Sequence, residues 1–302
     1  MQSDKMKLIL DTDIGPDCDD AGALGLLHEL AIDNRVEILA VTHCTSNPYG
    51  AGCIDAINNA YGSRGIPIGT YNRPGFLDSE EYQKYNRFIA QNYPNRYPDG
   101  RNVPEAVSIL RKALASQNDG SIVICAIGPL NNISDLLKSL PDETSDLSGS
   151  MLIKKKVKRL VVMGGSFQTA EWNFSMCKSA TINIINEWPT EIWFAIFETG
   201  QNIITGRNWH NMKPEHPVRK AYQLYAPAGR MSWDLTAVWA SVMGPDPYFK
   251  LSETGYLTVT EEGRSLWQAD ERGNHRYITA IVPDDMIAEE FDRIIGQSRK
   301  YI

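Results

Sequence analysis

The chain has 302 residues, of which 42% are hydrophobic and 22% charged, so it has the composition of a globular protein with ample apolar material for a large core. Its 30 Lys and Arg residues against 37 Asp and Glu give a formal net charge of −7. This acidic balance, without any basic block, argues against nucleic acid or an anionic membrane as the main partner, and no apolar run approaches the ~20 residues needed to cross a bilayer.

The N-terminal sequence and the cysteines give information on the cellular compartment of the protein. The stretch 1–7 is polar and lacks the apolar core of a signal peptide, so we expect a cytoplasmic protein, with an exported form whose leader has been removed as the alternative. The five cysteines are scattered, odd in number and free of any CxxC pair. They therefore suggest neither a zinc site nor a disulfide framework, and they fit a reducing compartment.

Apolar runs and helical periodicity alternate along the chain. Buried strands are predicted at 7–10, 36–42, 66–68, 121–127, 157–163 and 192–197. Helices are predicted at 20–31, 51–61, 103–116, 130–140, 231–243 and 284–295. Two late segments, 256–260 and 276–282, have the pattern of a hairpin pair.

This alternation predicts an α/β fold with a mostly parallel, doubly wound sheet and helices on both faces. No internal repeat, low-complexity tract or interdomain linker interrupts it, so we expect a single domain over 1–302. The segment 71–100 is rich in Tyr, Asn, Arg and Pro and has poor periodicity, which predicts an irregular insertion over the body. In such sheets ligands bind beyond the carboxyl ends of the strands, and the chemically unusual residues of this chain follow strand ends.

The most informative segment directly follows the first predicted strand. It holds five carboxylates within ten residues, those of Asp11, Asp13, Asp17, Asp19 and Asp20, and no Lys or Arg occurs between Lys7 and Arg35. Carboxylates that share a small, partly desolvated space either protonate or are neutralised by a cation, and oxygen ligands suit Ca²⁺ or Mg²⁺. The alternative reading makes Asp19 or Asp20 a helix cap and Asp17 an exposed turn residue.

Two known metal-loop patterns fit this segment poorly. An EF-hand counted from Asp11 needs Gly at its sixth position and Glu at its twelfth, where the chain has Pro16 and Gly22. The segment 8–13 is similar to the opening of the haloacid-dehalogenase-like phosphatases, which implies Asp11 as nucleophile with Mg²⁺. However, Gly15 stands where that pattern has Thr or Val, and the later lysine and acidic motif are not apparent.

A third pattern fits better. Asp11-Thr-Asp13-Ile-Gly15 followed by Asp19-Asp20-Ala21 resembles the signature of the inosine–uridine-preferring nucleoside hydrolases, with a two-residue expansion before the paired aspartates. Further similar blocks follow in the family's order: Val41-Thr42 through Ser46-Asn47, GPLNNI at 128–133, VVMGG at 161–165, AEWN at 170–173, and Ser232-Trp233-Asp234 with Thr236-Ala237. Each block alone is weak to moderate evidence, but together and in order they are strong.

The resemblance implies a Ca²⁺ ion at the strand ends. Its ligands would be the carboxylates of Asp13, Asp20 and Asp234 and the main-chain carbonyl of Asn131, where the family usually has Thr. Asp11 would orient the loop from behind these ligands. Taken alone, Asp234 would equally suit a helix cap.

The resemblance also implies hydrolysis of the N-glycosidic bond of a ribonucleoside or related N-riboside, giving ribose and free base through an oxocarbenium-like transition state. Asp19 would take the proton from a water oriented by the metal. The sugar hydroxyls would be held by Asn47, Glu171 and Asn173, with Met163 packed near the sugar. A plain turn residue is the alternative for Asn47, and core packing is the alternative for Met163.

One departure from the family concerns the leaving base. The purine and inosine–uridine members place a His before the late metal Asp as the acid for the leaving base, and this chain has Trp233 there. Trp cannot supply a proton at physiological pH, so another group protonates the base, the base leaves unprotonated, or the substrate is not a standard nucleoside. His43 follows a strand end and is a candidate base contact, with a structural role as its alternative; Trp172 and Trp233 could stack on a base.

Three functions therefore stand at this point: a Ca²⁺-dependent nucleoside hydrolase, a non-catalytic nucleoside- or ribose-binding protein on the same scaffold, and a haloacid-dehalogenase-like phosphatase. The resemblance further implies a homo-oligomer, a dimer or tetramer. The sequence does not give the base preference, the group that protonates the base, or the role of the 71–100 insertion.

Overall fold

The computed structural model describes residues 5–297, so the start of the polar N-terminal stretch lies outside the described residues. Within 5–297, no helix is long and apolar enough to span a membrane.

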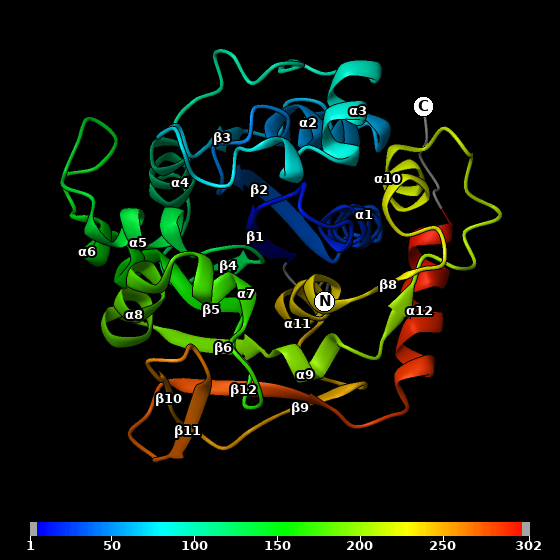
Figure 1. The fold of residues 1–302 in the computed structure, drawn as a ribbon. Coiled ribbons are helices and arrows are strands. Elements are labelled where there is room, and N and C mark those ends of the chain that lie inside the picture. The colour runs from blue at the N-terminus through cyan, green and yellow to red at the C-terminus, as the bar shows by residue number, and fades with distance from the viewer. Residues whose placement is uncertain (1–4, 298–302) are drawn as a thin grey trace.

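A mixed, mostly parallel sheet forms the centre of the molecule (Figure 1). Its parallel strands, in spatial order, are β3 (Ile68–Thr70), β2 (Val36–His43), β1 (Met6–Thr12), β4 (Ile122–Ala126), β5 (Val157–Met163), β6 (Glu191–Ala195) and β12 (His275–Ala280). The chain thus runs outward from β1 to β3 in one direction and from β4 to β6 in the other. The order of the strands reverses between β1 and β4, which is where ligands bind in sheets of this kind.

The far edge of the sheet is antiparallel. β10 (Gly255–Val259) pairs along its length with β11 (Ser265–Ala269), β9 (Phe249–Leu251) pairs with β12, and β12 itself runs parallel to β6. The predicted pair 256–260 and 276–282 corresponds to β10 and β12, which are neighbours in the sheet and pair antiparallel at Gly255 and His275. They do not form a hairpin, however, because β11 lies between them in the chain and is the hairpin partner of β10. The hairpin closes earlier, through a turn at Thr260–Arg264, where the amide of Thr260 donates to the carbonyl of Arg264 over 2.8 Å.

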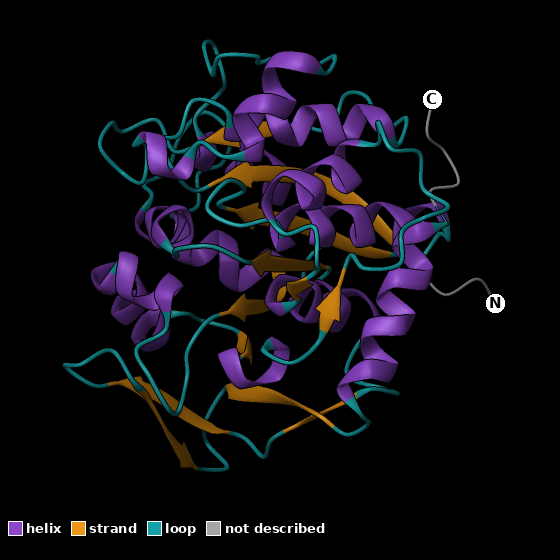
Figure 2. Ribbon diagram, turned by 45° about the vertical axis from the view of Figure 1, so that its right-hand side comes forward, coloured by secondary structure: helices purple, strands orange, loops and turns teal. Residues whose placement is uncertain are grey.

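Helices cover both faces of this sheet, as Figure 2 shows. The longer helices are α1 (Asp19–Ile32), α2 (Gly50–Ala60), α4 (Ala106–Ala115), α8 (Lys178–Glu187), α10 (Pro217–Tyr225), α11 (Trp233–Met243) and α12 (Asp284–Gly296). Shorter elements complete the fold: α3 (Tyr85–Asn92), α5 (Asn131–Lys138), α6 (Gly149–Lys156), η1 (Glu80–Tyr82), α7 (Trp172–Met176), α9 (Phe197–Gly200), and the pair β7 (Ile204–Thr205) and β8 (Arg230–Met231).

The strand pleat explains the two layers of helices. Leu8 and Leu10 of β1 are fully buried in one apolar cluster with residues of α1, α2, α11 and α12, whereas Ile9 is fully buried in a second cluster with residues of α4, α5, α6 and α8. Since successive side chains of a strand point to opposite faces, a strand buried on both faces is a continuous apolar run. The predicted doubly wound α/β class is confirmed.

The 71–100 segment is more ordered than its sequence suggested, because it contains η1 and α3. The Arg96 guanidinium donates to the buried carboxylate of Asp55 on α2, with an Nη2–Oδ1 distance of 2.7 Å. The Asn86 side chain is fully buried. The expectation of an irregular segment is therefore wrong over 85–92, and polar anchors of this kind leave little trace in hydrophobic periodicity.

A buried histidine makes the stability of the fold depend on pH. His28 stacks on Tyr61 with ring centroids 4.8 Å apart, its Nε2 donates to Asn58 Oδ1 over 2.8 Å, and burial lowers its pKa to about 4. Because the unfolded chain binds this proton already near pH 6.5, the stabilisation is present above pH 6.5 and is lost as the pH falls toward 4.

We expect the free energy of unfolding of the wild type to lose about 1.4 kcal/mol per pH unit more than that of His28→Gln between pH 6.5 and 4.5. Urea denaturation of both proteins at several pH values measures this difference. Identical pH slopes would show that His28 is not held neutral in the folded state.

Candidate active site

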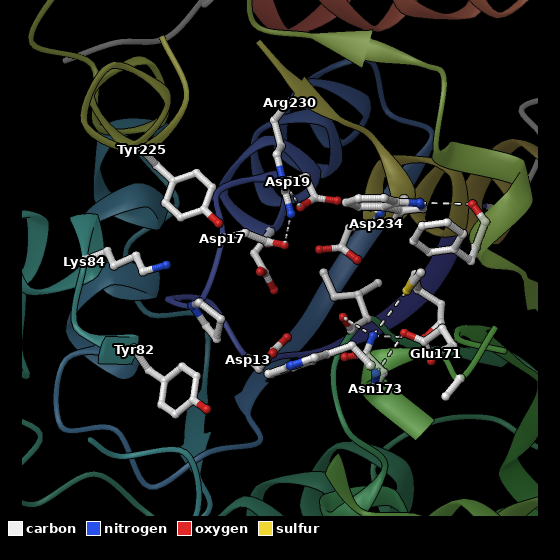
Figure 3. Close-up of a pocket in the computed structure, with 18 of the residues that line it drawn as sticks. Asp13, Asp17, Asp19, Tyr82, Lys84, Glu171, Asn173, Tyr225, Arg230 and Asp234 are labelled. Atoms are coloured by element: carbon white, nitrogen blue, oxygen red, sulfur yellow. Dashed lines mark hydrogen bonds and ion pairs between the residues drawn. The ribbon is translucent and has the colours of Figure 1, made fainter. Parts of the chain in front are cut away.

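A cavity of 530 Å³ lies over the carboxyl ends of the central strands. The loop after β1, the loop after β4, the loop after β5 and the start of α11 contribute to its wall, and residues from the 71–100 segment and from the end of α10 close another side (Figure 3). The position is the one that the reversal of strand order between β1 and β4 predicts.

Four buried aspartates share this cavity: Asp13, Asp19, Asp20 and Asp234 are each at most 5% exposed. Burial raises the pKa of all four well above the usual range of a carboxyl, and the charges of neighbouring aspartates raise each of them further. Desolvation and like charge both disfavour the ionised forms, and a bound cation would reverse both effects. A positively charged ligand would therefore stabilise the ionised form of these four aspartates.

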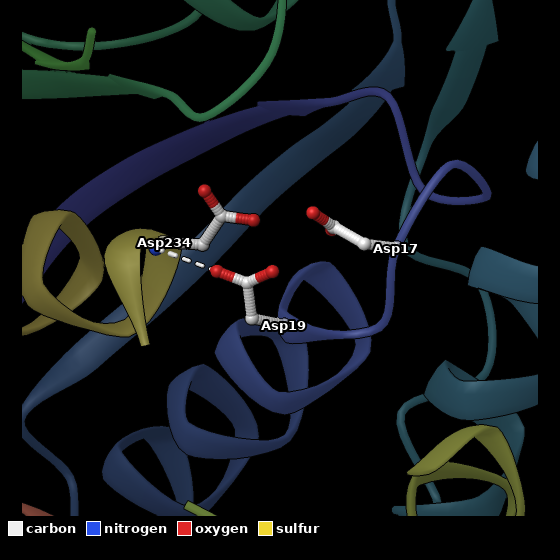
Figure 4. Close-up of side chains that lie close together, drawn as sticks. All are labelled: Asp17, Asp19 and Asp234. Carbon is white, nitrogen blue, oxygen red and sulfur yellow. Dashed lines mark hydrogen bonds between the residues drawn. The ribbon is translucent and has the colours of Figure 1, made fainter. Parts of the chain in front are cut away.

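A set of three carboxylates that overlaps these four has the geometry of a metal site, and it shares only Asp234 with the ligands that the resemblance implies. Carboxylate oxygens of Asp17, Asp19 and Asp234 lie within 4.8 Å of one another (Figure 4). Asp13 packs against Gly128, where a Cβ atom would lie only 2.6 Å from Asp13 Oδ1. A set of oxygen donors without nitrogen or sulfur fits a hard divalent cation.

Two contacts fix the paired aspartates at the start of α1. The hydroxyl of Thr12 donates to Asp20 Oδ1, and the backbone amide of Asp234 donates to Asp19 Oδ2 over 3.2 Å. The second contact joins the first loop of the chain to the first turn of α11. Asp19 thus accepts from an unpaired amide at a helix N-terminus, where negative charge is favoured.

Asp11 lies behind the cavity and does not line it. It is fully buried, and its Oδ1 accepts from the Thr42 hydroxyl over 2.5 Å and from the Asn132 side chain over 2.8 Å. Burial raises its pKa to about 7. The phosphatase hypothesis is wrong in this respect, because a carboxylate sealed in this way cannot attack a phosphorus atom.

Asn131 is the first residue of α5, and its side chain donates to the carbonyl of Cys44 over 2.8 Å. Its side chain thereby ties the loop after β4 to the loop after β2. Asn131 is not among the residues that line the cavity.

The AEWN block forms the opposite wall. The Glu171 carboxylate caps α7 by accepting from the amides of Asn173 and Phe174 over 2.8 and 3.0 Å, and burial raises its pKa. Asn173 Nδ2 donates to the carbonyl of Met163 over 3.2 Å. Glu171, Asn173 and Met163 all line the cavity, so three of the four predicted substrate contacts lie on one surface.

Asn47 and His43 lie elsewhere. Asn47 Nδ2 donates to the carbonyl of Tyr82 over 3.1 Å, which ties the 71–100 segment to the loop after β2. His43 is fully buried against Gly50, its ring bonds to Thr45 over 3.1 Å, and burial lowers its pKa to about 3. His43 therefore cannot make the base contact proposed for it from the sequence, because backbone and hydroxyl groups enclose the ring.

Aromatic rings line the mouth of the cavity. Trp233 stacks on Phe197 with centroids 5.1 Å apart and donates its Nε1–H to the Phe197 carbonyl over 3.0 Å. Trp172 meets Tyr82 edge to face at 6.5 Å. Both tryptophans predicted to contact a base thus line the cavity. Among its lining residues in the described chain, none is a histidine.

Sequence reasoning missed several lining residues, among them Tyr82, Lys84, Tyr225 and Arg230, and it misjudged Asp17. Asp17 is not a plain exposed turn residue, because its Oδ2 accepts from Arg230 Nη2 over 2.7 Å. Arg230 lies far along the chain on β8, and no local motif surrounds it. The only hint of such a basic residue in the sequence is that a cluster of aspartates requires some positive charge to neutralise it.

An acidic cavity beneath aromatic rings, placed where the strand order of a parallel sheet reverses, defines an α/β enzyme that acts on a small molecule. The sequence model of the inosine-uridine preferring nucleoside hydrolases matches residues 8–264, and the chain belongs to that family. It is accordingly an N-glycosyl hydrolase of a metal-dependent family, and its aspartate cluster could bind a metal.

Solved structures share the fold at low sequence identity. An inosine-uridine preferring nucleoside hydrolase from Bacillus anthracis has a TM-score of 0.73 at 17% identity, covering 98% of this chain and 100% of that one. A purine-preferring ribonucleoside hydrolase from Gardnerella vaginalis has 0.70 at 19%, with 98% and 100% covered. The effector XopQ, solved with adenosine diphosphate ribose, has 0.71 at 12%, with 99% and 94% covered. A search of curated proteins gave no match.

We expect Ca²⁺ to stabilise the protein through this cluster, by about 2.7 kcal/mol when the free ion is about 100-fold above its Kd. Asp20→Asn and Asp234→Asn should abolish the stabilisation, because each removes a charged oxygen donor. Thermal unfolding with and without Ca²⁺, after treatment with a chelator, measures the effect. Asp285→Asn, an exposed aspartate of α12, is the matched control and should keep it. An undiminished response in Asp234→Asn would place the ion elsewhere.

Proposed function

We propose that this protein hydrolyses the N-glycosidic bond of a ribonucleoside or a related N-riboside in a Ca²⁺-dependent reaction that releases ribose and the free base. The observation that carries the proposal is the convergence of Asp13, Asp19, Asp20 and Asp234 in one buried cavity, opposite a wall formed by Glu171 and Asn173. Membership of the nucleoside hydrolase family supports the reaction class.

The proposed ligands are the carboxylates of Asp13, Asp20 and Asp234 and the main-chain carbonyl of Asn131. In support, the first three are buried and line the same cavity. When bound, a divalent cation lowers the pKa of water and can hold two sugar hydroxyls. Asp11 acts on this set from behind, because its bonds to Thr42 at the end of β2 and to Asn132 at the start of α5 fix these elements against the end of β1.

Asp19 is the proposed general base. Its Oδ2 is held by the amide of Asp234, and its Oδ1 lies 4.0 Å from Arg230 Nε, so the carboxylate has a fixed direction and a nearby positive charge. From this position Asp19 takes a proton from the attacking water. The sugar ring then gains positive charge, which the surrounding carboxylates stabilise.

The sugar is proposed to lie between the aspartates and Glu171, with its hydroxyls bonded to Glu171 and Asn173 and its ring against Met163. The caps and bonds that these side chains make within the protein hold them in position before a ligand arrives, which is the arrangement that binding sites require. Asn47 would act through the position of the Tyr82 segment, to which its side chain amide is bonded. Trp172 and Trp233 would stack on the base.

Among the described residues no histidine lines the cavity, and this favours one second candidate: a protein that binds nucleosides or ribose without cleaving them. The two candidates differ in one measurement, the release of free ribose over hours from a ligand that demonstrably binds.

A panel of ribonucleosides that includes p-nitrophenyl riboside tests the proposal, with free ribose as the measured product. We expect the wild type to cleave at least one of them, and Asp19→Asn to lose about 10²–10⁴-fold in kcat while still binding the ligand, because the amide cannot accept the proton.

Asp285→Asn again serves as the control and should turn over normally. Full turnover by Asp19→Asn would exclude Asp19 as the base. Binding of nucleosides without release of ribose from any of them would establish the second candidate.

A further inference from the structure

The cavity has two ends, and only one is taken up by the proposed sugar site. Glu171 and Asn173 lie on one side of the aspartates, and Tyr82, Lys84 and Tyr225 lie on the other (Figure 3). If the sugar lies between the aspartates and Glu171, the base extends toward the second end. The residues at that end therefore decide how the base departs.

Departure of a base needs either a proton or a stabilised negative charge, because the electron pair of the broken C–N bond stays on a ring nitrogen. Trp233 cannot supply the proton, since its only polar hydrogen is bonded to the Phe197 carbonyl. Arg230 does not release its proton, and it is paired with Asp17. Burial raises the pKa of the Tyr225 and Tyr82 hydroxyls, and the neighbouring Glu81 raises that of Tyr82 further, so both are weaker acids than a free tyrosine.

Lys84 is the remaining strong candidate at this end. Its ammonium lies 4.8 Å from the centre of the Tyr225 ring, and Figure 3 shows it pointing into the cavity between the two tyrosines. Within residues 5–297, no carboxylate pairs with it. It is thus a positive charge on the cavity wall that a ligand can use.

The place of Lys84 in its own helix supports a role beyond folding. It is the N-cap residue of α3 and makes no side-chain cap bond. Ser, Thr, Asp and Asn are preferred at that position, and a positive charge at a helix N-terminus is unfavourable by about 0.3–1 kcal/mol. Helix stability therefore does not account for a lysine there.

The segment that carries Lys84 is held firmly against the catalytic loop. The carbonyl of Tyr82 accepts from Asn47 Nδ2 over 3.1 Å and from Asn86 Nδ2 over 3.2 Å. A Cβ atom on Gly15 would lie 2.4 Å from Asn86 Nδ2 and 3.0 Å from the Tyr82 carbonyl oxygen. The absence of a side chain at Gly15 lets the aspartate loop and this segment touch, which sets Lys84 at a defined place opposite the carboxylates.

We propose that Lys84 is a catalytic residue that protonates the departing base; this rests on the proposed function. The bond between the anomeric carbon and the base nitrogen breaks, and its electron pair goes to the base, which takes a proton from the Lys84 ammonium. The water oxygen bonds to the anomeric carbon while Asp19 takes a water proton. The neutral Lys84 amine then regains a proton from solvent, directly or after relay from Asp19.

Two substitutions and two kinds of substrate test this. Lys84→Met removes charge and proton; Lys84→Arg keeps the charge on a group that does not release its proton. On inosine and uridine, we expect both variants to lose about 10²–10⁴-fold in kcat/KM. On p-nitrophenyl riboside, whose leaving group departs as a stabilised anion, both should stay within about 3-fold of the wild type. Lys112→Met, an exposed lysine of α4, is the control and should match the wild type on every substrate.

Each other outcome has a distinct meaning. A wild type that cleaves no riboside, p-nitrophenyl riboside included, refutes the proposed function itself. A wild type that cleaves nucleosides while Lys84→Met does so equally well overturns the role of Lys84. Full activity of Lys84→Arg overturns proton transfer, and equal losses on nucleosides and on p-nitrophenyl riboside show a general defect of the site and overturn the proposal as well.

Discussion

The mutual repulsion of buried carboxylates is the constraint on which the rest of this structure depends. Asp13, Asp19, Asp20 and Asp234 are removed from water, and both burial and their neighbours' charges raise the pKa of each. A fold keeps such a group of side chains together only if something compensates for the charge. Arg230 compensates for Asp17 at the edge of the group, and oxygen ligands at the centre suit a divalent ion.

The sheet brings these residues together from distant parts of the chain. Asp19 begins the helix after β1, and the amide that fixes it belongs to Asp234 at the start of α11, 215 residues further on. Small residues make the approach possible, since a side chain at Gly128 would collide with Asp13 and one at Gly15 with the Asn86 amide. The aspartates and the two glycines therefore act together: the aspartates supply the charge, and Gly15 and Gly128 leave the space in which the loops can approach one another.

Local pattern was enough to predict the parallel strands from β1 to β6, but not the antiparallel edge of the sheet or everything that lines the cavity. β5 has the predicted bounds, and α1 lies within one residue of them at each end, because a buried strand or helix shows itself in its own apolar residues. Arg230 and Lys84 had no such signal, since each acts on residues that are remote in sequence. His43 was misplaced for the same reason: its position after a strand was visible, but the hydroxyls of Thr45 and Thr70 around its ring were not.

The charged side chains of the cavity are divided between the two ends of the glycosidic bond, with the acidic ones around the place proposed for the sugar and a basic one near the place proposed for the base. Among residues 5–297, its lining holds six acidic side chains and two basic ones, and one of the two basic ones, Arg230, is bound to Asp17. Negative charge therefore surrounds the place proposed for the sugar, which becomes positive in an oxocarbenium-like transition state. The remaining positive charge, Lys84, faces the place where the base gains an electron pair. Because Trp233 cannot donate a proton, Lys84 on the wall opposite Glu171 is the proposed proton source for the base. The 71–100 segment, which carries Lys84, thereby becomes part of the reaction centre.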